Sequence, residues 1–252
     1  MRLLLLSDIH SNLEALEACL DAAPEYDAAA CLGDIVGYGG SPNQTIDLVR
    51  AMHPIVVRGN HDRACCGLED TGAFNPIAAA AAVWTQAQLS DHNLDWLRAL
   101  PCGPVTSPRW KDARFVHGSP VHEDIYITSN RDASEALQTA AEALTFFGHT
   151  HVQGAFAWHA GKTAALSPEP MRTASRLHAT RIKLSAATRY LFNPGSVGQP
   201  RDRDRRAAFA LYDSVKHEVR FYRTPYDIKQ AQQRILEAGL PKALAFRLEE
   251  GR

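Results

Sequence analysis

Cysteine is scarce in this sequence and follows no pattern. The 252 residues include five cysteines, an odd number, and no two of them form a CxxC pair. This usage argues against a disulfide framework and predicts a protein of the reducing cytoplasm. The adjacent Cys65 and Cys66 follow His61 closely, but we predict that they are packing residues.

Long apolar runs and a net charge are also lacking. The N-terminal run is four leucines, and Asp8 follows it. A signal peptide needs roughly seven apolar residues and a membrane span roughly 20, so this stretch predicts a β-strand and no membrane association. The net charge of −1 gives no overall positive field that would recruit nucleic acid. Any attraction for an anion must therefore be local.

The first 60 residues alternate between apolar runs and amphipathic patterns. We expect strands at 2–7, 28–32 and 55–57, with helices at 12–22 and 42–50 between them. Ser11 and Glu14 form a capping-box pattern for the first of these helices. The strand–helix order predicts parallel pairing, with helices on the faces of the sheet. In such sheets, the chemistry lies beyond the carboxyl ends of the strands.

The rest of the chain predicts a different arrangement. Residues 76–100 read as two helices split near Ser90, and 134–143 as a further helix. Expected strands lie at 114–116, 144–147, 152–158, 189–192, 207–212 and 218–222. The last four have no helices between them, which predicts a second, mixed or antiparallel sheet packed on the first.

Residues 161–185 are expected to form a loop or hairpin insertion. Two short helices, broken at 239–241, are expected in a tail from about Tyr226. The predicted fold is a single α/β domain over 1–252, with two packed mixed β-sheets flanked by helices.

Potential metal ligands follow the predicted strands wherever a strand ends. The seven residues are Asp8, His10, Asp34, Asn60, His117, His149 and His151. If the strand at 144–147 continues as extended chain, His149 and His151 point the same way, because side chains alternate along a strand. Each residue alone has another interpretation: the aspartates as caps, Asn60 as a turn residue, His117 as a core histidine. The set as a whole, at matching strand ends, predicts a metal site.

The number and type of these ligands predict two ions. A catalytic tetrahedral site needs about three protein ligands, and seven suit two metals that share a carboxylate. The nitrogen and oxygen donors fit Mn²⁺, which we prefer, and also Fe²⁺, Ni²⁺, Co²⁺ or Zn²⁺. Two divalent ions and two carboxylates leave a charge of about +2, which attracts phosphate and lowers the pKa of a bound water. His61 is not needed as a ligand and is the natural general acid, and Asp62 beside it could orient it.

The motifs resemble those of the calcineurin-like metallophosphoesterase superfamily. They are Asp8-Ile9-His10, Gly33-Asp34, Gly59-Asn60-His61-Asp62, His117-Gly118 and Gly148-His149-Thr150-His151. Asn193-Pro194-Gly195-Ser196 and the helical tail resemble the small bacterial and archaeal phosphodiesterase branch. The resemblance implies a two-sheet sandwich flanked by helices. It also implies that Asp8, His10 and His151 hold one metal, that Asn60, His117 and His149 hold the other, and that Asp34 bridges them.

Weaker signals concern the substrate. Tyr38 follows Asp34 and could line the pocket, and Asn193 and Ser196 could form a wall of it. His122 and Tyr126 are further candidates. The arginines of 201–206 alternate with Asp202 and Asp204, which is typical of a solvated turn, with an anion grip as the alternative.

Three functions are compatible with this sequence. We prefer a phosphodiesterase in which a metal-activated hydroxide attacks phosphorus in line. The substrate would be a small phosphoester, a nucleotide among the candidates. A phosphomonoesterase or protein serine/threonine phosphatase of the same superfamily is the alternative, but Tyr38 stands where those phosphatases have an arginine. A non-catalytic scaffold is disfavoured because no ligand is missing. The sequence leaves the oligomeric state open, a homo-oligomer included.

Overall fold

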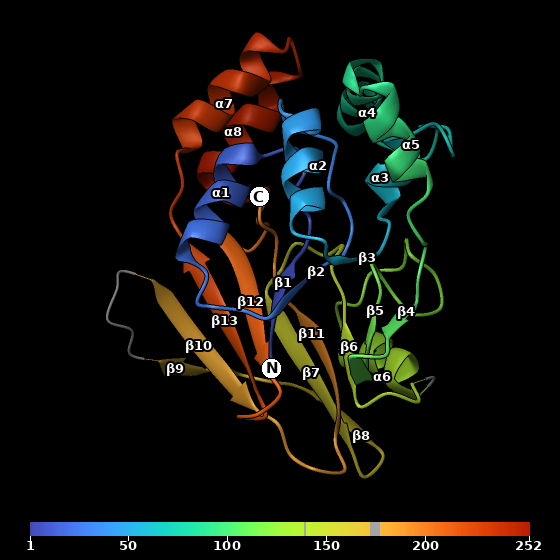
Figure 1. Ribbon diagram of the computed structural model, residues 1–252, viewed down its shortest axis with the longest axis vertical. Helices are drawn as coiled ribbons and strands as arrows, with labels where there is room; N and C mark the ends of the chain where they lie inside the picture. Colours follow the sequence, from blue (N-terminus) through green and yellow to red (C-terminus); the bar gives the residue numbers. More distant parts are fainter. Residues whose placement is uncertain (139, 172–176) are drawn as a thin grey trace.

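Two mixed β-sheets face each other and helices cover their outer sides (Figure 1). The computed structural model describes residues 1–138, 140–171 and 177–252. The first sheet has the strand order β3 (Ile55–Val56), β2 (Ala28–Cys31), β1 (Arg2–Leu6), β12 (Ala207–Asp213), β13 (Glu218–Thr224), β10 (His178–Lys183) and β9 (Glu169–Met171). The second has the order β4 (Val105–Ser107), β5 (Trp110–Phe115), β6 (Leu144–Phe146), β11 (Arg189–Asn193), β7 (Gly154–His159) and β8 (Lys162–Ala165).

The leucine run of β1 explains its central place. Side chains alternate along a strand, and both faces of β1 are covered. Leu3 and Leu5 point into the core between the sheets, while Leu4 and Leu6 pack under helices. A strand with two covered faces reads as a continuous apolar run, as this one does.

The predicted parallel unit is confirmed. β1 pairs in parallel with β2, and β2 with β3. The intervening helices are α1 (Leu13–Ala22) and α2 (Pro42–Ala51), whose buried residues pack on the outer side of this sheet. The carboxyl ends of the three strands therefore meet at one edge.

The predicted division into an N-terminal and a C-terminal sheet is wrong. β12 and β13 join the first sheet, where β12 lies antiparallel to β1. β5 and β6, from the first half of the chain, join β11 and β7 in the second sheet. Every residue of β12 is buried, which suits an interior strand. The apolar pattern predicts such a strand but does not identify its partner.

Residues 161–185 contain more structure than a loop. β8 pairs with β7, and β9 and β10 extend the first sheet beyond β13. Residues 172–176 of this stretch lie outside the described part. These antiparallel pairs agree with the hairpin alternative. β8 and β9 are edge strands, which have one side in solvent and tolerate polar residues and proline.

Several helix boundaries differ from the prediction. Asn12, not Ser11, caps α1, because its side chain accepts from the backbone N–H of Ala15 at 3.1 Å. α6 spans Asn130–Gln138 and so begins before the predicted 134, and residue 139 is outside the described part. A short helix was missed at the predicted loop of Asn60: α3 (Asn60–Cys65).

The remaining helices agree with the prediction. α4 (Pro76–Gln88) and α5 (Asp91–Arg98) are split at Ser90, and α7 (Ile228–Glu237) and α8 (Lys242–Glu250) form the tail. Cys65 and Cys66 pack in the core, as expected. In the described residues, no helix is long and apolar enough to cross a membrane.

We predict that Leu5→Ala lowers the free energy of unfolding by about 2–5 kcal/mol, because it opens a cavity between the sheets. Chemical denaturation measures this cost. The control is Val215→Ala in an exposed turn, where 75% of the residue is accessible and the expected change is within about 0.5 kcal/mol. Equal, small effects of both substitutions would contradict a packed core at this interface.

Candidate metal centre and cleft

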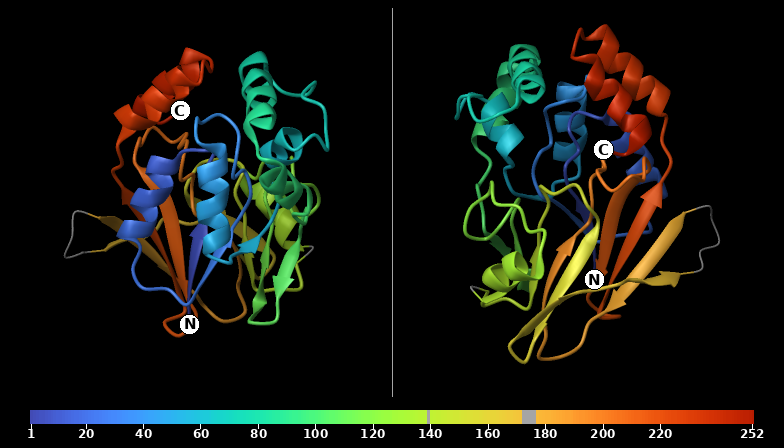
Figure 2. Two further views of the ribbon diagram at one scale, coloured as in Figure 1. Left: turned by 45° about the horizontal axis from the view of Figure 1, so that its top comes forward. Right: turned by 180° about the vertical axis from the view of Figure 1, so that it is seen from behind.

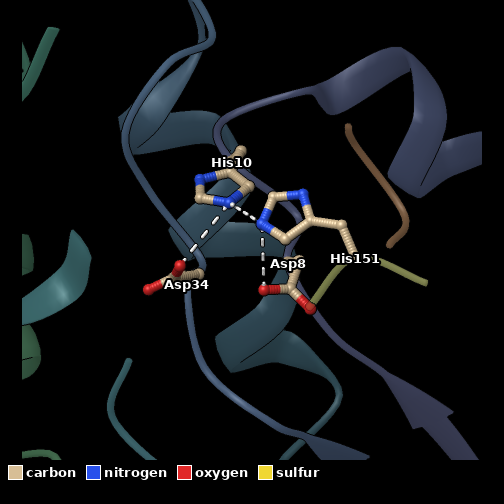
Figure 3. Close-up of side chains that lie close together, drawn as sticks. All are labelled: Asp8, His10, Asp34 and His151. Atoms are coloured by element: carbon tan, nitrogen blue, oxygen red, sulfur yellow. Dashed lines mark hydrogen bonds and ion pairs between the residues drawn. The ribbon is translucent and has the colours of Figure 1, made fainter. Parts of the chain in front are cut away.

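Loops at the carboxyl ends of five strands bring the predicted ligands together. These loops follow β1, β2, β3, β5 and β6. Two groups of side chains could each hold a metal ion, with all ligand atoms of a group within 4.8 Å of one another. One group is Asp8, His10, Asp34 and His151, and the other is Asp34, His117 and His149. Figure 3 shows the first group, in which the two imidazoles and two carboxylates converge.

Asp34 lies between the two groups. Its Oδ2 atom is 3.5 Å from Nε2 of His10 and 3.5 Å from Nε2 of His117. Oδ2 is buried and has no hydrogen-bond partner, whereas Oδ1 accepts the backbone N–H of His61 at 2.8 Å. A buried carboxylate oxygen without a partner is costly. A cation on each side of Oδ2 would satisfy it.

The histidines are oriented by hydrogen bonds to backbone carbonyls. Nδ1 of His10 lies 3.1 Å from the oxygen of Val36. Nδ1 of His117 and Nδ1 of His151 lie 2.7 and 2.6 Å from the oxygens of Leu32 and Gln199. Carbonyls only accept, so these Nδ1 atoms carry the protons and leave Nε2 with a lone pair in the neutral ring. Metal-ligating histidines are oriented in the same way.

The inner ring nitrogens face one another. Nε2 of His10 is 3.1 Å from Nε2 of His151, and Nε2 of His117 is 3.1 Å from Nδ1 of His149. Two lone pairs at this distance repel each other unless a cation or a proton lies between them. The donor set therefore fits a divalent ion in each group.

Asn60 and Asp8 complete these groups. Oδ1 of Asn60 is 3.1 Å from Nε2 of His117, which places the amide with the second group. Asp8 lies 3.3 Å from Nε2 of His151 and accepts the backbone N–H of His149 with both oxygens at 3.1 Å. The structure thus brings all seven predicted ligands to one place.

The backbone around these ligands is unusual. Asp8, His10, Asp34, His149 and His151 all have φ between 50° and 65°, which non-glycine residues seldom adopt. The prediction that His149 and His151 leave an extended strand on one side is therefore wrong: β6 ends at Phe146, and the two side chains turn into different groups. Such local strain persists where the surrounding structure holds it, often at functional sites.

Close packing explains Gly59. A Cβ atom at this position would lie 2.1 Å from Oδ1 of Asp34 and 2.3 Å from its backbone nitrogen. Only glycine lets the loop after β3 approach the loop after β2. This approach brings Asn60 and His61 beside Asp34.

Burial and neighbouring charges shift the ligand pKa values. Burial raises the pKa of Asp8 to about 7, and the charge of Asp34 adds to this. Burial disfavours a charged His117, but the carboxylates of Asp34 and Asp8 outweigh it and raise the pKa of His117 to about 10. Burial lowers the pKa of His10 and that of His151 well below the usual range.

His61 is buried beside the ligands and lines a cleft. Its Nδ1 has no hydrogen-bond partner and lies against Gly37, where a Cβ atom would be 2.7 Å away. Burial lowers the pKa of His61 to about 4, although Asp34 acts in the opposite direction. The ring is therefore neutral near pH 7, and an anion placed next to it would favour its protonation.

Asp62 does not orient His61 as predicted. One of its oxygens accepts the backbone N–H groups of Ile35 and Val36 at 2.8 and 3.1 Å. The other accepts that of Gly59 at 3.0 Å. Asp62 therefore fastens the loop of Asp34 to the start of α3. Its role is to position ligands.

Asn193 and Ser196 are also in a different place from the one expected. Nδ2 of Asn193 donates to the oxygen of Gly148 at 2.8 Å, and Oγ of Ser196 donates to the oxygen of Asp8 at 2.7 Å. Both are buried, and neither lines the cleft. They brace the ligand loops and are not positioned to contact substrate.

Tyr38 is among the residues that line a cleft at this site, but its ring is largely covered. Its ring packs against His10 and His61, with centroids 4.6 and 4.3 Å apart, and only 7% of the residue is exposed. Guanidinium groups of Arg201 and Arg247 lie over it at 6.0 and 5.8 Å. The Tyr38 ring is therefore covered by protein side chains and has no open face for a substrate ring.

A cleft of about 270 Å³ opens over the second group of ligands. Asn60, His61 and His149 line it, together with Phe74 and Tyr126. The ring of Tyr126 stacks on His149 with centroids 4.0 Å apart, and 47% of the residue is exposed. Tyr126 was a weak candidate from the sequence. Phe74 was missed, because nothing in its neighbourhood distinguishes it from a packing residue. His122 does not line the cleft.

Comparisons with known proteins agree with this architecture. The model of the calcineurin-like phosphoesterase superfamily domain matches residues 1–217. The uncharacterized protein MJ0912 of Methanocaldococcus jannaschii is 35% identical over 255 residues, which cover 98% of this chain and 97% of that protein.

Two solved structures extend the comparison. A metallophosphoesterase from Sphaerobacter thermophilus is 38% identical with a TM-score of 0.85, covering 100% of this chain and 99% of that one. The hypothetical protein PH1004 from Pyrococcus horikoshii is 22% identical with a TM-score of 0.77, covering 100% and 98%, and supports the fold alone. The predicted fold class of two packed mixed sheets flanked by helices is confirmed.

Metal affinity should depend on pH at this site. Ligands must lose their protons to bind a metal, so the raised pKa of Asp8, about 7, makes binding weaker below that pH. We expect Mn²⁺ affinity to rise from pH 6 to pH 8, by up to about tenfold per unit for each proton released. Calorimetry in two buffers of different ionisation enthalpy counts the protons. Binding that releases none at pH 6 would contradict this ligand set.

Proposed function

Because the chain belongs to the calcineurin-like phosphoesterase superfamily, we propose that it is a phosphodiesterase that uses two divalent metal ions. The observation that carries this proposal is the position of Asp34. Its buried, unpartnered Oδ2 lies at the same distance from a histidine of each ligand group. A shared carboxylate of this kind is what a two-metal site requires.

Each ion would have its own ligands besides Asp34. Asp8, His10 and His151 would hold one ion, and Asn60, His117 and His149 the other. The mixed nitrogen and oxygen set is compatible with Mn²⁺, which we propose, and also with Fe²⁺, Ni²⁺, Co²⁺ and Zn²⁺. When bound, such a pair supplies a water of lowered pKa and a positive clamp for phosphate oxygens.

The cleft supports an ester with an aromatic or nucleoside group. Phe74 and Tyr126 line it beside His61 and His149, so a flat group leaving the phosphorus would meet aromatic side chains. His61 would give the leaving oxygen its proton. The phosphate itself would help, because an anion near the ring raises the pKa of His61 from about 4.

The described lining of the cleft contains no arginine that is free of a carboxylate partner, which favours diesters. Arg63 is the only arginine that lines the cleft among the described residues, and it is engaged with Glu69, Glu123 and Asp124. A monoester dianion gains more from free arginines than a diester does. Tyr38 occupies the position at which the protein phosphatases of this superfamily carry an arginine.

The first test compares substrates under one metal and one pH. We expect a higher kcat/KM for bis(p-nitrophenyl) phosphate than for p-nitrophenyl phosphate with Mn²⁺, and loss of both activities on chelation. A clear preference for the monoester would refute the phosphodiesterase. No metal-restored hydrolysis of either would refute the enzyme.

Asp34→Asn should damage the enzyme more than Asn60→Ala. Asp34 would contact both ions and neutralise part of their repulsion, whereas Asn60 is one neutral ligand of one ion. Metal analysis is expected to give fewer than two ions per chain for Asp34→Asn, with activity near background. If Asp34→Asn keeps both ions and most of its activity, then Asp34 is not the bridge.

His61→Ala should keep both ions and slow hydrolysis by roughly 10²–10⁴ for poor leaving groups, because the leaving oxygen lacks its proton donor. Nitrophenolate leaves without much help, so its deficit should be smaller. Paired kinetics on an alkyl and an aryl diester measure the difference. Equal losses on both would remove His61 from the acid role.

A further inference from the structure

Two arginines from distant parts of the chain meet on Tyr38, next to the metal ligands. Arg201 follows β11, and Arg247 lies on α8. Both are half-buried, and their guanidinium carbons lie 6.0 and 5.8 Å from the centre of the Tyr38 ring. Since that ring packs on His10, the two cations flank the candidate metal centre.

Neither arginine is paired with an aspartate or glutamate in the described part of the chain. Three carboxylates near them in sequence pair with other arginines. These pairs are Asp202 with Arg223, Asp204 with Arg206, and Glu250 with Arg252. Two neighbouring cations thus lack a compensating side chain.

The hydrogen bonds of the two arginines leave capacity for a ligand. Arg201 donates from Nη2 to Gln199 at 3.1 Å, but its buried Nε has no hydrogen-bond partner among the described residues. Arg247 donates from Nε to the main-chain oxygen of Arg252 at 2.8 Å. Burial lowers the pKa of Arg247, and the charge of Arg201 lowers it further. Two metal ions nearby would add to this repulsion, which an anion would relieve.

A groove beside Arg247 adjoins the cleft over the candidate ligands, and the two share Asn75. The groove has a volume of about 590 Å³ and lies between the start of α4 and α8, where Asn75, Leu244 and Arg247 line it. Asn75 also lines the cleft beside His61. Helices α4 and α8 lie at one end of the molecule in both views of Figure 2. An elongated ligand could therefore extend from the metal centre to Arg247.

We propose that Arg201 and Arg247 bind a second phosphoryl group of the substrate. The natural substrate would then be an ester with at least two linked phosphates, such as a nucleoside oligophosphate. One phosphorus would lie at the metal centre and the other beside Tyr38. Guanidinium groups suit this task because their fork of donors matches phosphate oxygens. This inference rests on the proposed function, since it places the reacting phosphate at the metals.

Equilibrium binding tests the subsite without requiring turnover. Two probes share one nucleoside and differ by one phosphoryl group: adenosine 5′-(α,β-methylene)diphosphate and AMP. Both are titrated into the manganese-loaded protein by calorimetry. We expect the diphosphate analogue to bind about tenfold or more tightly, a difference of about 1.4 kcal/mol. Arg201→Gln and Arg247→Gln should each reduce this ratio severalfold.

The matched control is Arg205→Gln, an exposed arginine of the same turn as Arg201 that does not line the groove. It should keep the wild-type ratio of affinities for the two probes. Binding of the probes to free Mn²⁺ is the same for every variant, so it cannot produce a difference between Arg205→Gln and the other two. Thermal melting checks that each variant is folded. No preference in the wild type, or one ratio for all variants, would overturn the subsite. Hydrolysis of bis(p-nitrophenyl) phosphate reports separately on the proposed function.

Discussion

The structure depends on one costly arrangement: acceptor atoms crowded around Asp34 in a buried space. Histidine nitrogens with lone pairs face each other at 3.1 Å in two places, and a carboxylate oxygen between them has no partner. Burial raises the pKa of Asp8 to about 7, and the carboxylates of Asp34 and Asp8 raise that of His117 to about 10 despite its burial, so that protons remain on this site when no cation is bound. Divalent cations held by the same atoms would satisfy them in place of the protons. The rest of the fold keeps these atoms together.

The side chains around Asp34 are held in place more by backbone groups than by pairs of side chains. Parallel strands β1, β2 and β3 deliver their loops to one edge, and carbonyls of Leu32, Val36 and Gln199 orient the imidazoles. Asp62, Asn193 and Ser196 tie the loops to each other. These three residues were expected to act on the substrate or on His61. Each instead holds loops that carry candidate ligands, so we expect a substitution there to act through the position of those ligands.

Strand ends could be predicted from the sequence, but contacts between distant segments could not. The ligands were found because apolar runs end in Asp, Asn or His, and the order of strands and helices placed those ends at one edge. The sheet to which β12 belongs depends on pairing with β1, some 200 residues away, which no local pattern encodes. The same applies to Arg247, whose place on Tyr38 requires the C-terminal helices to fold back over the site. Phe74 resembles any packing residue until the cleft is seen.

A crystal structure of the Mn²⁺-loaded protein with anomalous diffraction data tests directly whether Asp34 bridges two ions. We expect two manganese peaks, one on each side of the Asp34 carboxylate, the first among Asp8, His10 and His151 and the second among Asn60, His117 and His149. A single peak in an active, fully loaded preparation, or two peaks of which only one contacts Asp34, would contradict the bridge.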